Sequence, residues 1–252
     1  MPVKRSHSAA RVLKLLEAVA EQQPIGVRSL ARLLDEDPSA TQRALMTLAD
    51  NGWIATTRES PVRWEVTARI LAVAHAAHGG NDLRKRARAA LERLRDATNE
   101  TVLLVLPDVS GFVVADVIES QQILRVVLQV GTKVGAHKTA TGRAVLPFLA
   151  SKRQAELLGT IPDRQMLQIF EHTRVHGYAI SEGEVHEATT NLASPIFDFA
   201  GQPLGAIVVS GPRARLTKQV IKMIAEKLVR TSREVSQNVP PGIGVPAIAS
   251  GR

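Results

Sequence analysis

The stretch from residue 27 to residue 50 constrains the fold of this chain more than any other. It contains two short amphipathic runs with helical spacing. The apolar positions that share a face are Leu30, Ala31 and Leu34 in the first run and Ala44, Leu45 and Leu48 in the second. Between the runs, Asp37 is suited to capping a helix and Pro38 to the first helical position. Because so short a connection makes the two helices pack against each other, the stretch predicts a helix-turn-helix unit.

The flanking sequence extends this unit to a winged helix-turn-helix domain. An amphipathic run over residues 8–21 precedes it, and two β-prone runs, residues 53–57 and 62–66, follow it around a polar turn. A further apolar helix is predicted over residues 68–78. We therefore predict a DNA-binding domain over residues 1–78, mainly helical with a β-hairpin wing. The apolar faces of the first and last of these helices exceed what a small domain needs for its own core, which indicates the contact surfaces of a homodimer.

The second helix of the unit carries the residue types that read DNA. A recognition helix needs an apolar face that holds it on its domain and polar or basic side chains near its start, where bases and phosphates are reached. Glutamine suits adenine, and arginine suits guanine or phosphate. The predicted DNA-binding residues are Ser39, Thr41, Gln42, Arg43 and Thr47 on this helix and Arg58 and Arg63 on the wing. The formal charge of +8 agrees with a double-stranded DNA operator as the partner, but it is spread along the chain and does not locate the contact.

From residue 100 onward the pattern changes to β-branched runs mixed with helical ones. Strands are predicted over residues 101–106, 111–118, 123–128, 192–197 and 204–210, and helices over residues 81–98, 139–150, 152–158, 164–176 and 216–235. Strands at hairpin spacing mixed with helices are typical of an α+β domain with a mainly antiparallel sheet, which we place at residues 79–238. Gly79-Gly80 supplies a hinge before it, and residues 239–252, rich in proline and glycine, are predicted to form a flexible tail.

Composition excludes several classes of protein. The chain has no cysteine, which rules out a disulfide framework, a zinc ribbon and a thiol nucleophile. Its start lacks the apolar core of a secretory signal, and no stretch approaches the ~20 apolar residues of a membrane span, so we expect a cytoplasmic protein without membrane contact. Neither a nucleophile elbow nor a phosphate or dinucleotide loop occurs, and we expect no enzyme, no metal and no cofactor. The alternative is a metal-dependent enzyme or metal sensor that uses His172 and His176, four residues apart on one predicted helix.

Stretches in both halves, in order and at matching spacing, resemble the IclR family of bacterial transcription regulators. They are SAARVLKLL (8–16), RSLARLL (28–34), SATQRALMTLADNGWI (39–54), NETVLLVL (99–106), HKTATGRAVLPFL (137–149), HGYAISEGE (176–184), NLASPIFD (191–198) and LGAIVVSGP (204–212). The resemblance implies a GAF-like sensor domain that binds a small, often acidic metabolite, and dimers that can pair into tetramers. Arg143 stands where the family usually has lysine, and Ala188-Thr189-Thr190 departs from the family near the expected pocket, so the usual ligand does not carry over.

The predicted effector site lies at the start of the helix 139–150. Its first residues, Thr139, Ala140, Thr141 and Gly142, follow an extended segment, so their backbone amides are free to favour an anion and their small side chains let a ligand approach. The alternative is that Thr139 only caps the helix and Gly142 only packs. The resemblance adds Ser181, Glu182, Asn191, Val208 and Ser210, and the apolar Val208 implies a partly hydrophobic ligand. We expect a small organic acid, against the alternative of a large domain that only dimerises.

Overall fold

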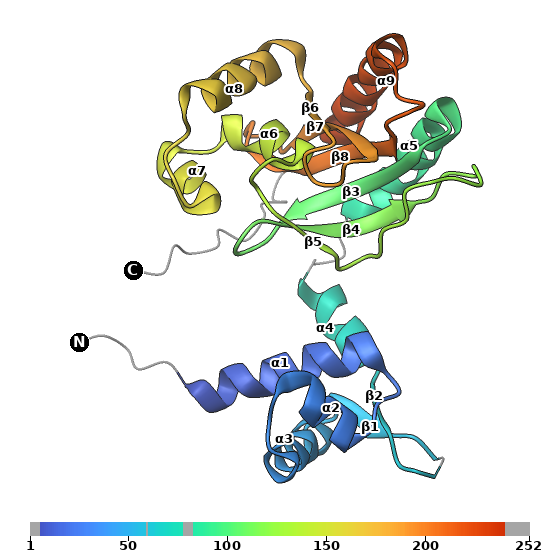
Figure 1. Cartoon of the computed structure of the whole chain (residues 1–252), viewed down its shortest axis with the longest axis vertical. Helices are drawn as coiled ribbons and strands as arrows, with labels where there is room; N and C mark the ends of the chain where they lie inside the picture. The colour runs from blue at the N-terminus through green and yellow to red at the C-terminus, as the bar shows by residue number, and fades with distance from the viewer. Residues whose placement is uncertain (1–5, 59, 78–82, 240–252) are drawn as a thin grey trace. The chain divides into compact units, whose positions relative to one another are not determined.

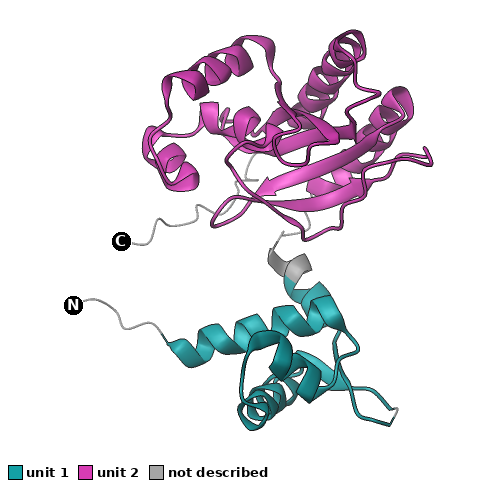
Figure 2. Cartoon of the chain, in the orientation of Figure 1, with its two compact units in different colours: residues 1–81 teal, residues 82–252 magenta. Residues whose placement is uncertain are grey.

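The computed structural model describes residues 6–58, 60–77 and 83–239. The chain divides into two compact units, residues 1–81 and 82–252, which Figure 2 shows in different colours. The predicted hinge at Gly79-Gly80 and, apart from Val239, the predicted tail lie outside the described residues.

The first unit contains the predicted helices and hairpin. The elements are α1 (His7–Gln22), α2 (Val27–Leu34), α3 (Pro38–Asp50), β1 (Ile54–Thr56), β2 (Trp64–Val66) and α4 (Arg69–Ala77), labelled in Figure 1. The strands β1 and β2 pair antiparallel, and Ile25 joins the hairpin through an isolated bridge to Trp64. The unit is therefore a helix-turn-helix with a two-stranded wing.

Local residue choices set the turn between α2 and α3. Asp35 ends α2 in the left-handed region, at φ 54°, which aspartate tolerates better than most residues. The Asp37 side chain accepts the amide of Ala40 at 2.7 Å, and Pro38 occupies the first turn of α3. The three helices then close on one core, whose buried members include Leu15, Val19, Leu30, Leu45 and Trp64.

The second unit is built on one six-stranded antiparallel sheet in the order β5-β4-β3-β8-β7-β6. Its strands are β3 (Thr101–Pro107), β4 (Phe112–Ile118), β5 (Lys133–Val134), β6 (Ala179–Glu182), β7 (Thr189–Phe197) and β8 (Pro203–Pro212). Its helices are α5 (Leu83–Thr98), α6 (Ala140–Val145), α7 (Ser151–Leu158), α8 (Arg164–His176) and α9 (Lys218–Gln237), with a 3-10 turn at Leu146–Phe148. This is the α+β fold with an antiparallel sheet that the sequence predicts.

Helices cover both faces of this sheet, as Figure 1 shows. On one face α5 and α9 pack side by side over a core that includes Leu91, Leu192, Val209, Ile224 and Leu228. On the other face α6 and α8 cover a second core that includes Leu103, Val145, Phe170, Ala193 and Ala206. Alternate residues of β3, β7 and β8 therefore belong to opposite faces, and both faces are buried.

Two sequence predictions need correction here, and two short strands were missed. Residues 123–128 form no strand, although their β-branched run favours one, because no neighbouring strand supplies a hydrogen-bonded ladder along this segment. The helix predicted over residues 139–150 ends as α6 at Val145 and passes into the 3-10 turn at Pro147, where proline lacks the amide that a continuing helix needs. The strands β5 and β6 were not predicted, since runs of two and four residues give little periodic signal.

Candidate DNA-binding surface and sensor site

The helix α3 separates an anchoring face from a polar face. Ala44, Leu45 and Leu48 are buried in the core of the first unit. Ser39, Arg43 and Thr47 are exposed, and Gln42 is half-buried. Within the described part of the chain, the Arg43 guanidinium has no carboxylate partner. A free guanidinium beside short polar groups is the donor set that reads guanine or phosphate.

Thr41 does not share this polar face, and its prediction as a DNA-binding residue is wrong. Its side chain is completely buried, and its hydroxyl donates to the Asp37 carbonyl at 3.0 Å. The signal was present in the sequence, because Thr41 stands three and four residues before Ala44 and Leu45, on the apolar side of the helix. The threonine therefore stabilises the start of α3 from inside.

The wing and α2 add further cations. Arg58 and Arg63 are exposed on the hairpin, and among the described residues the Arg63 guanidinium contacts the Pro24 carbonyl at a long 3.4 Å. Arg28 and Arg32 are exposed on α2, which in such units crosses the DNA backbone, and they are not among the DNA-binding residues predicted from the sequence. Arg69 is committed instead to the fold: it donates to the Asn51 carbonyl at 2.7 Å and lies 5.1 Å from the centre of the Trp53 ring.

In the second unit, a row of polar side chains crosses the sheet on the face covered by α6. The strand register pairs Thr101 of β3 with Ser210, Ser210 with Asn191, and Asn191 with Ser181 of β6. The side chains of the row lie on the same face of the sheet as Leu103, Ala193 and Val208, which pack under α6. Tertiary structure thus brings together Ser181, Asn191, Val208 and Ser210, which are distant in sequence.

Hydrogen bonds within the row leave one donor unused. The Ser210 hydroxyl donates to the Asn191 side-chain carbonyl at 2.6 Å, and the Ser181 hydroxyl donates to the Lys138 carbonyl at 2.8 Å. Asn191 is partly exposed, and its amide nitrogen donates to no other described residue. An accessible amide donor among hydroxyls suits an oxygen-rich ligand.

The start of α6 is partly committed to its own fold. The Thr139 hydroxyl accepts the Gly142 amide at 3.0 Å and donates to the Gly135 carbonyl. A Cβ on Gly142 would lie 1.9 Å from the Ala136 carbonyl oxygen, so this glycine permits a close backbone contact. For Thr139 and Gly142 the capping and packing alternative describes the structure, and the Gly142 amide is not free. Ala140 and Thr141 keep first-turn amides that a helix cannot satisfy internally.

Glu182 is separated from the row. It is exposed, and its register partner Thr190 is buried on the opposite face of β7. The nearby acidic residue that contacts α6 is Glu184, which forms a two-point ion pair with Arg143 at 2.6 Å for each bond. Arg143 also donates to the Ile180 carbonyl at 2.7 Å. In the sequence, Arg143 stands out only as a departure from the family, and no local pattern indicates its partner.

The histidine pair on which the alternative of a metal site rests lies in an aromatic cluster. The rings of His172 and His176 are 4.3 Å apart between centres, and that of Tyr178 is 5.5 Å from His172. Burial lowers the pKa of His172, the charge of His176 lowers it further, and a backbone hydrogen bond at Tyr178 opposes both. Among the described residues, no three histidine or acidic side chains are grouped as metal ligands.

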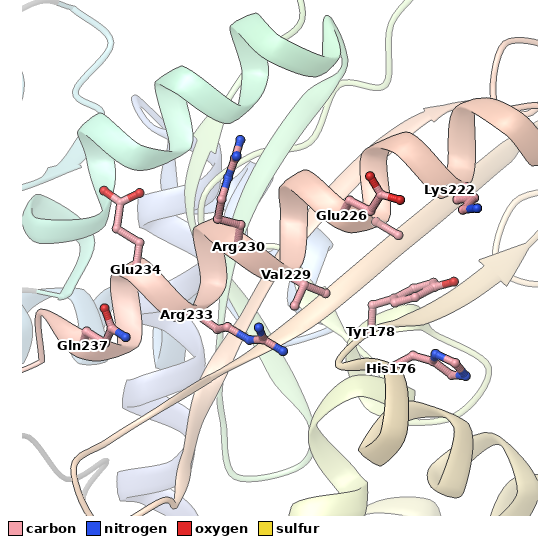
Figure 3. A pocket seen from close by; sticks show the side chains of 10 residues that line it. His176, Tyr178, Lys222, Glu226, Val229, Arg230, Arg233, Glu234 and Gln237 are labelled. Carbon is pink, nitrogen blue, oxygen red and sulfur yellow. The ribbon is translucent and has the colours of Figure 1, made fainter.

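Two cavities lie along α9, on the sheet face opposite to the polar row. The larger, about 690 Å³, is lined by His176, Tyr178 and one side of α9 and is shown in Figure 3. The smaller, about 320 Å³, includes Phe148 and Phe197 and shares Val229 and Arg233 with the first. Neither is lined by any residue of the predicted effector site.

Comparison with known proteins follows the same division into two parts. The model of the IclR helix-turn-helix domain matches residues 8–58, and the model described as bacterial transcriptional regulator IclR C-terminal matches residues 75–237. The HTH-type transcriptional regulator BhcR of Paracoccus denitrificans is 26% identical, over 92% of this chain and 86% of its own length. The acetate operon repressor of Salmonella typhimurium is also 26% identical, over 91% of this chain and 88% of its own.

Solved structures have the same architecture. Pseudomonas aeruginosa HmgR is 27% identical with a TM-score of 0.74, covering 93% of this chain and 99% of that one. The IclR protein of Thermotoga maritima, at 23% identity, has a TM-score of 0.71, covering 92% of this chain and 98% of that one. At 23% identity, the similarity to the Thermotoga maritima protein shows the fold alone. None of the helices in the described ranges has the length and apolar character needed to cross a membrane.

Proposed function

The chain belongs to the IclR family of bacterial transcriptional regulators, and from this premise we propose that it binds a specific duplex operator under the control of a small organic acid. It is a transcriptional regulator with a helix-turn-helix DNA-binding domain and not an enzyme. The curated relatives that match most of its length are transcriptional regulators too. One of the relatives reported above, the acetate operon repressor, is named a repressor, which supports repression as the mode of action here. We place this activity in the cytoplasm, where the operator is.

The observation that carries the DNA-binding proposal is the exposed face of α3. Ser39, Arg43 and Thr47 lie on it, while the opposite face anchors the helix in the core. In this arrangement Arg43 contacts guanine or phosphate, Gln42 contacts a base edge, and Ser39 and Thr47 contact phosphates. Arg58 and Arg63 on the wing add contacts to the backbone beside the major groove.

A dimer is the form that such a unit requires, because one recognition helix reads few base pairs. Apolar side chains remain exposed on two of its helices: Leu13 on α1, and Leu71 and Val73 on α4. Exposed apolar groups on adjacent elements of a small domain favour contact with a second copy. We propose that α1 and α4 form this contact.

Selection of binding sites from random duplexes by the full chain tests the DNA proposal. We expect a partly palindromic site whose half-sites are separated by about 34 Å, one helical turn, or a multiple of it. Recovery of duplexes with no shared sequence, at an affinity that falls equally for all with salt, would show electrostatic binding only and contradict specific reading.

The effector proposal rests on the polar row beneath α6. The unused amide of Asn191 donates to a carboxylate, the amides of Ala140 and Thr141 face the same anion, and Val208 lines an apolar side. Ligand binding changes DNA affinity only through different affinities for the DNA-bound and free arrangements. A small carboxylic acid with a short apolar body satisfies these groups together.

The test compares two isosteric substitutions while a panel of small carboxylic acids is screened by thermal shift. Asn191→Asp keeps the acceptor for Ser210 and replaces the donor with a negative charge. We expect it to weaken binding of the active acid by roughly tenfold or more, about 1.4 kcal/mol. Asn238→Asp, at the exposed end of α9, adds the same charge elsewhere and should bind normally. Unchanged affinity of Asn191→Asp would place the acid somewhere else.

A further inference from the structure

Three side chains of α9 stand four residues apart and line both of the cavities beside this helix. They are Val229, Arg233 and Gln237, and residues at this spacing share one side of a helix. Figure 3 shows Val229 and Arg233 reaching toward the side on which His176 and Tyr178 lie. The two cavities therefore meet along α9 in one groove, the α9 groove, whose size suits a small ligand. The proposed function does not account for it.

The larger cavity has an excess of positive charge. Its formally charged lining consists of Lys222, Arg230, Arg233, Glu226 and Glu234. One of the two carboxylates, that of Glu234, is neutralised by an ion pair with Arg93 of α5. The cations of the groove thus outnumber the carboxylates that remain to balance them, which favours an anionic ligand.

Arg233, at the junction of the two cavities, is the cation best placed to hold that anion. Most arginines that the structure describes in this unit hold a carboxylate, among them Arg88, Arg95, Arg125, Arg143, Arg153 and Arg215. Arg174, which lines the smaller cavity, is committed to Glu171 and to the Pro147 carbonyl. Arg233 is exposed and makes no hydrogen bond or ion pair to any described residue. Its guanidinium is therefore open to a ligand from either cavity.

The smaller cavity supplies an apolar wall. Phe148 and Phe197 line it in an edge-to-face contact, with ring centres 4.8 Å apart. The hydroxyls beside them, those of Ser194, Ser232 and Ser236, each donate to a backbone carbonyl at 2.6–2.7 Å. An apolar group can occupy this cavity without leaving one of these hydroxyls unpaired, so it avoids the cost of burying an unsatisfied polar group.

We propose that the α9 groove binds a small aromatic carboxylate, at a site separate from the effector site beneath α6. The carboxylate pairs with Arg233, because a guanidinium holds a carboxylate at two points. The ring lies against Phe148 and Phe197, because aromatic rings gain stability from offset or edge-to-face contact beyond the apolar area that they bury. A ligand with only the charge or only the ring uses half of the groove and binds more weakly.

The single tyrosine of the chain reports on this groove. Tyr178 lines the larger cavity, so the full chain labelled with fluorotyrosine has its fluorine at this site alone. Titration with benzoate should shift the fluorine resonance saturably. Acetate, which lacks the ring, and benzyl alcohol, which lacks the charge, should need far higher concentrations for the same shift. No saturable shift with benzoate, or equal titrations with all three compounds, would overturn the proposal.

Two arginine variants locate the carboxylate. Arg233→Gln removes the guanidinium from an exposed position and should raise the Kd for benzoate by roughly tenfold or more. Arg164→Gln, at the start of α8, is the matched control: this arginine is also exposed, has no partner among the described residues and lies outside the groove. It should bind benzoate as the natural chain does. An unchanged Kd in Arg233→Gln would contradict the site.

Asn191→Asp separates this proposal from the proposed function. It alters the effector site and not the α9 groove, so the fluorine titration with benzoate should not change. A fluorine shift that is lost in Asn191→Asp but kept in Arg233→Gln would show that benzoate binds beneath α6 and acts on Tyr178 from there. That result would overturn the α9 site and leave the effector proposal standing.

A charge series at Gln237 tests the junction by gain as well as by loss. Gln237 is exposed and lines both cavities, so its substitution places a charge beside Arg233 without disturbing the core. Gln237→Arg adds a second guanidinium and should lower the Kd for benzoate. Gln237→Glu, which has nearly the same shape as the natural side chain, should raise it. An equal Kd in both variants, or the reverse order, would show that the carboxylate does not lie at this junction.

Discussion

Arg143 of α6 and Glu184 of the β6–β7 connection form an ion pair with two hydrogen bonds of 2.6 Å each. The same guanidinium donates to the Ile180 carbonyl in β6. One side chain therefore links α6 to the edge strand β6 and to the β6–β7 connection. The Arg143 side chain is largely buried and that of Glu184 partly so. Lysine at this position would have no planar fork with which to hold a carboxylate at two points.

Arg143→Lys should loosen the β6–β7 connection while the fold persists. Lysine keeps the charge but loses the paired geometry, at a cost of about 1 kcal/mol in the free energy of unfolding. Limited proteolysis should cut residues 183–188 faster in this variant than in the natural chain. Arg153→Lys, which affects a pair with Glu156 within α7, is the control and should leave that rate unchanged. Equal rates in all three proteins would show that the pair does not hold the connection.

Stability should depend on pH through Glu184. Partial burial alone would raise the pKa of this carboxyl, but the hydrogen bonds and charge of Arg143, with smaller help from Ser181 and the Glu182 backbone, outweigh it and lower the pKa below its ordinary value of 4.5. A lowered pKa in the folded state means that the stabilisation is complete above about pH 4.5 and is lost as the pH falls through the lowered value. Unfolding measured between about pH 6 and pH 3 should show a shallower loss for Glu184→Gln than for the natural chain. Identical slopes would assign the acid sensitivity to other carboxyls.

Gly142→Ala should disrupt the start of α6. The added methyl would lie 1.9 Å from a backbone oxygen, that of Ala136, which no side-chain rotation can relieve. We expect a loss of about 3 kcal/mol or more, as for severe overpacking. Gly135→Ala, a few residues earlier, meets nothing within 4 Å and is the matched control. Thermal unfolding distinguishes the two, and similar melting temperatures would show that the segment before α6 shifts freely.

Neighbouring positions on α3 should separate DNA binding from folding. Arg43→Ala removes an exposed guanidinium and should weaken operator binding by about 1–3 kcal/mol without changing the melting temperature. Thr41→Val removes a buried hydroxyl that bonds to Asp37 and should lower stability by about 1 kcal/mol with normal operator binding. Shift assays and thermal unfolding of both variants check the pair. If Arg43→Ala lowered stability and Thr41→Val weakened operator binding, the exposed and buried faces of α3 would have the reverse roles.

Local signals in the sequence determined the first unit almost completely. Asp37 and Pro38 start α3, and the spacing of Ala44, Leu45 and Leu48 sets its buried face, because capping and helical periodicity act between residues a few positions apart. The same spacing places Thr41 on the buried face of α3, so its burial could also have been predicted. The two-unit division and the antiparallel character of the sheet were also predictable, since they follow from runs and turns along the chain.

Only the tertiary structure decided which residues meet. Ser181, Asn191 and Ser210 form one row because β6, β7 and β8 pair in a particular register, and a shift of one residue would send their side chains to the other face. The ion pair of Arg143 with Glu184 likewise joins elements whose contact no local pattern encodes. Residues 123–128 have the composition of a strand but form none, because a strand exists only through a hydrogen-bonded partner, and the fold decides which segments are paired.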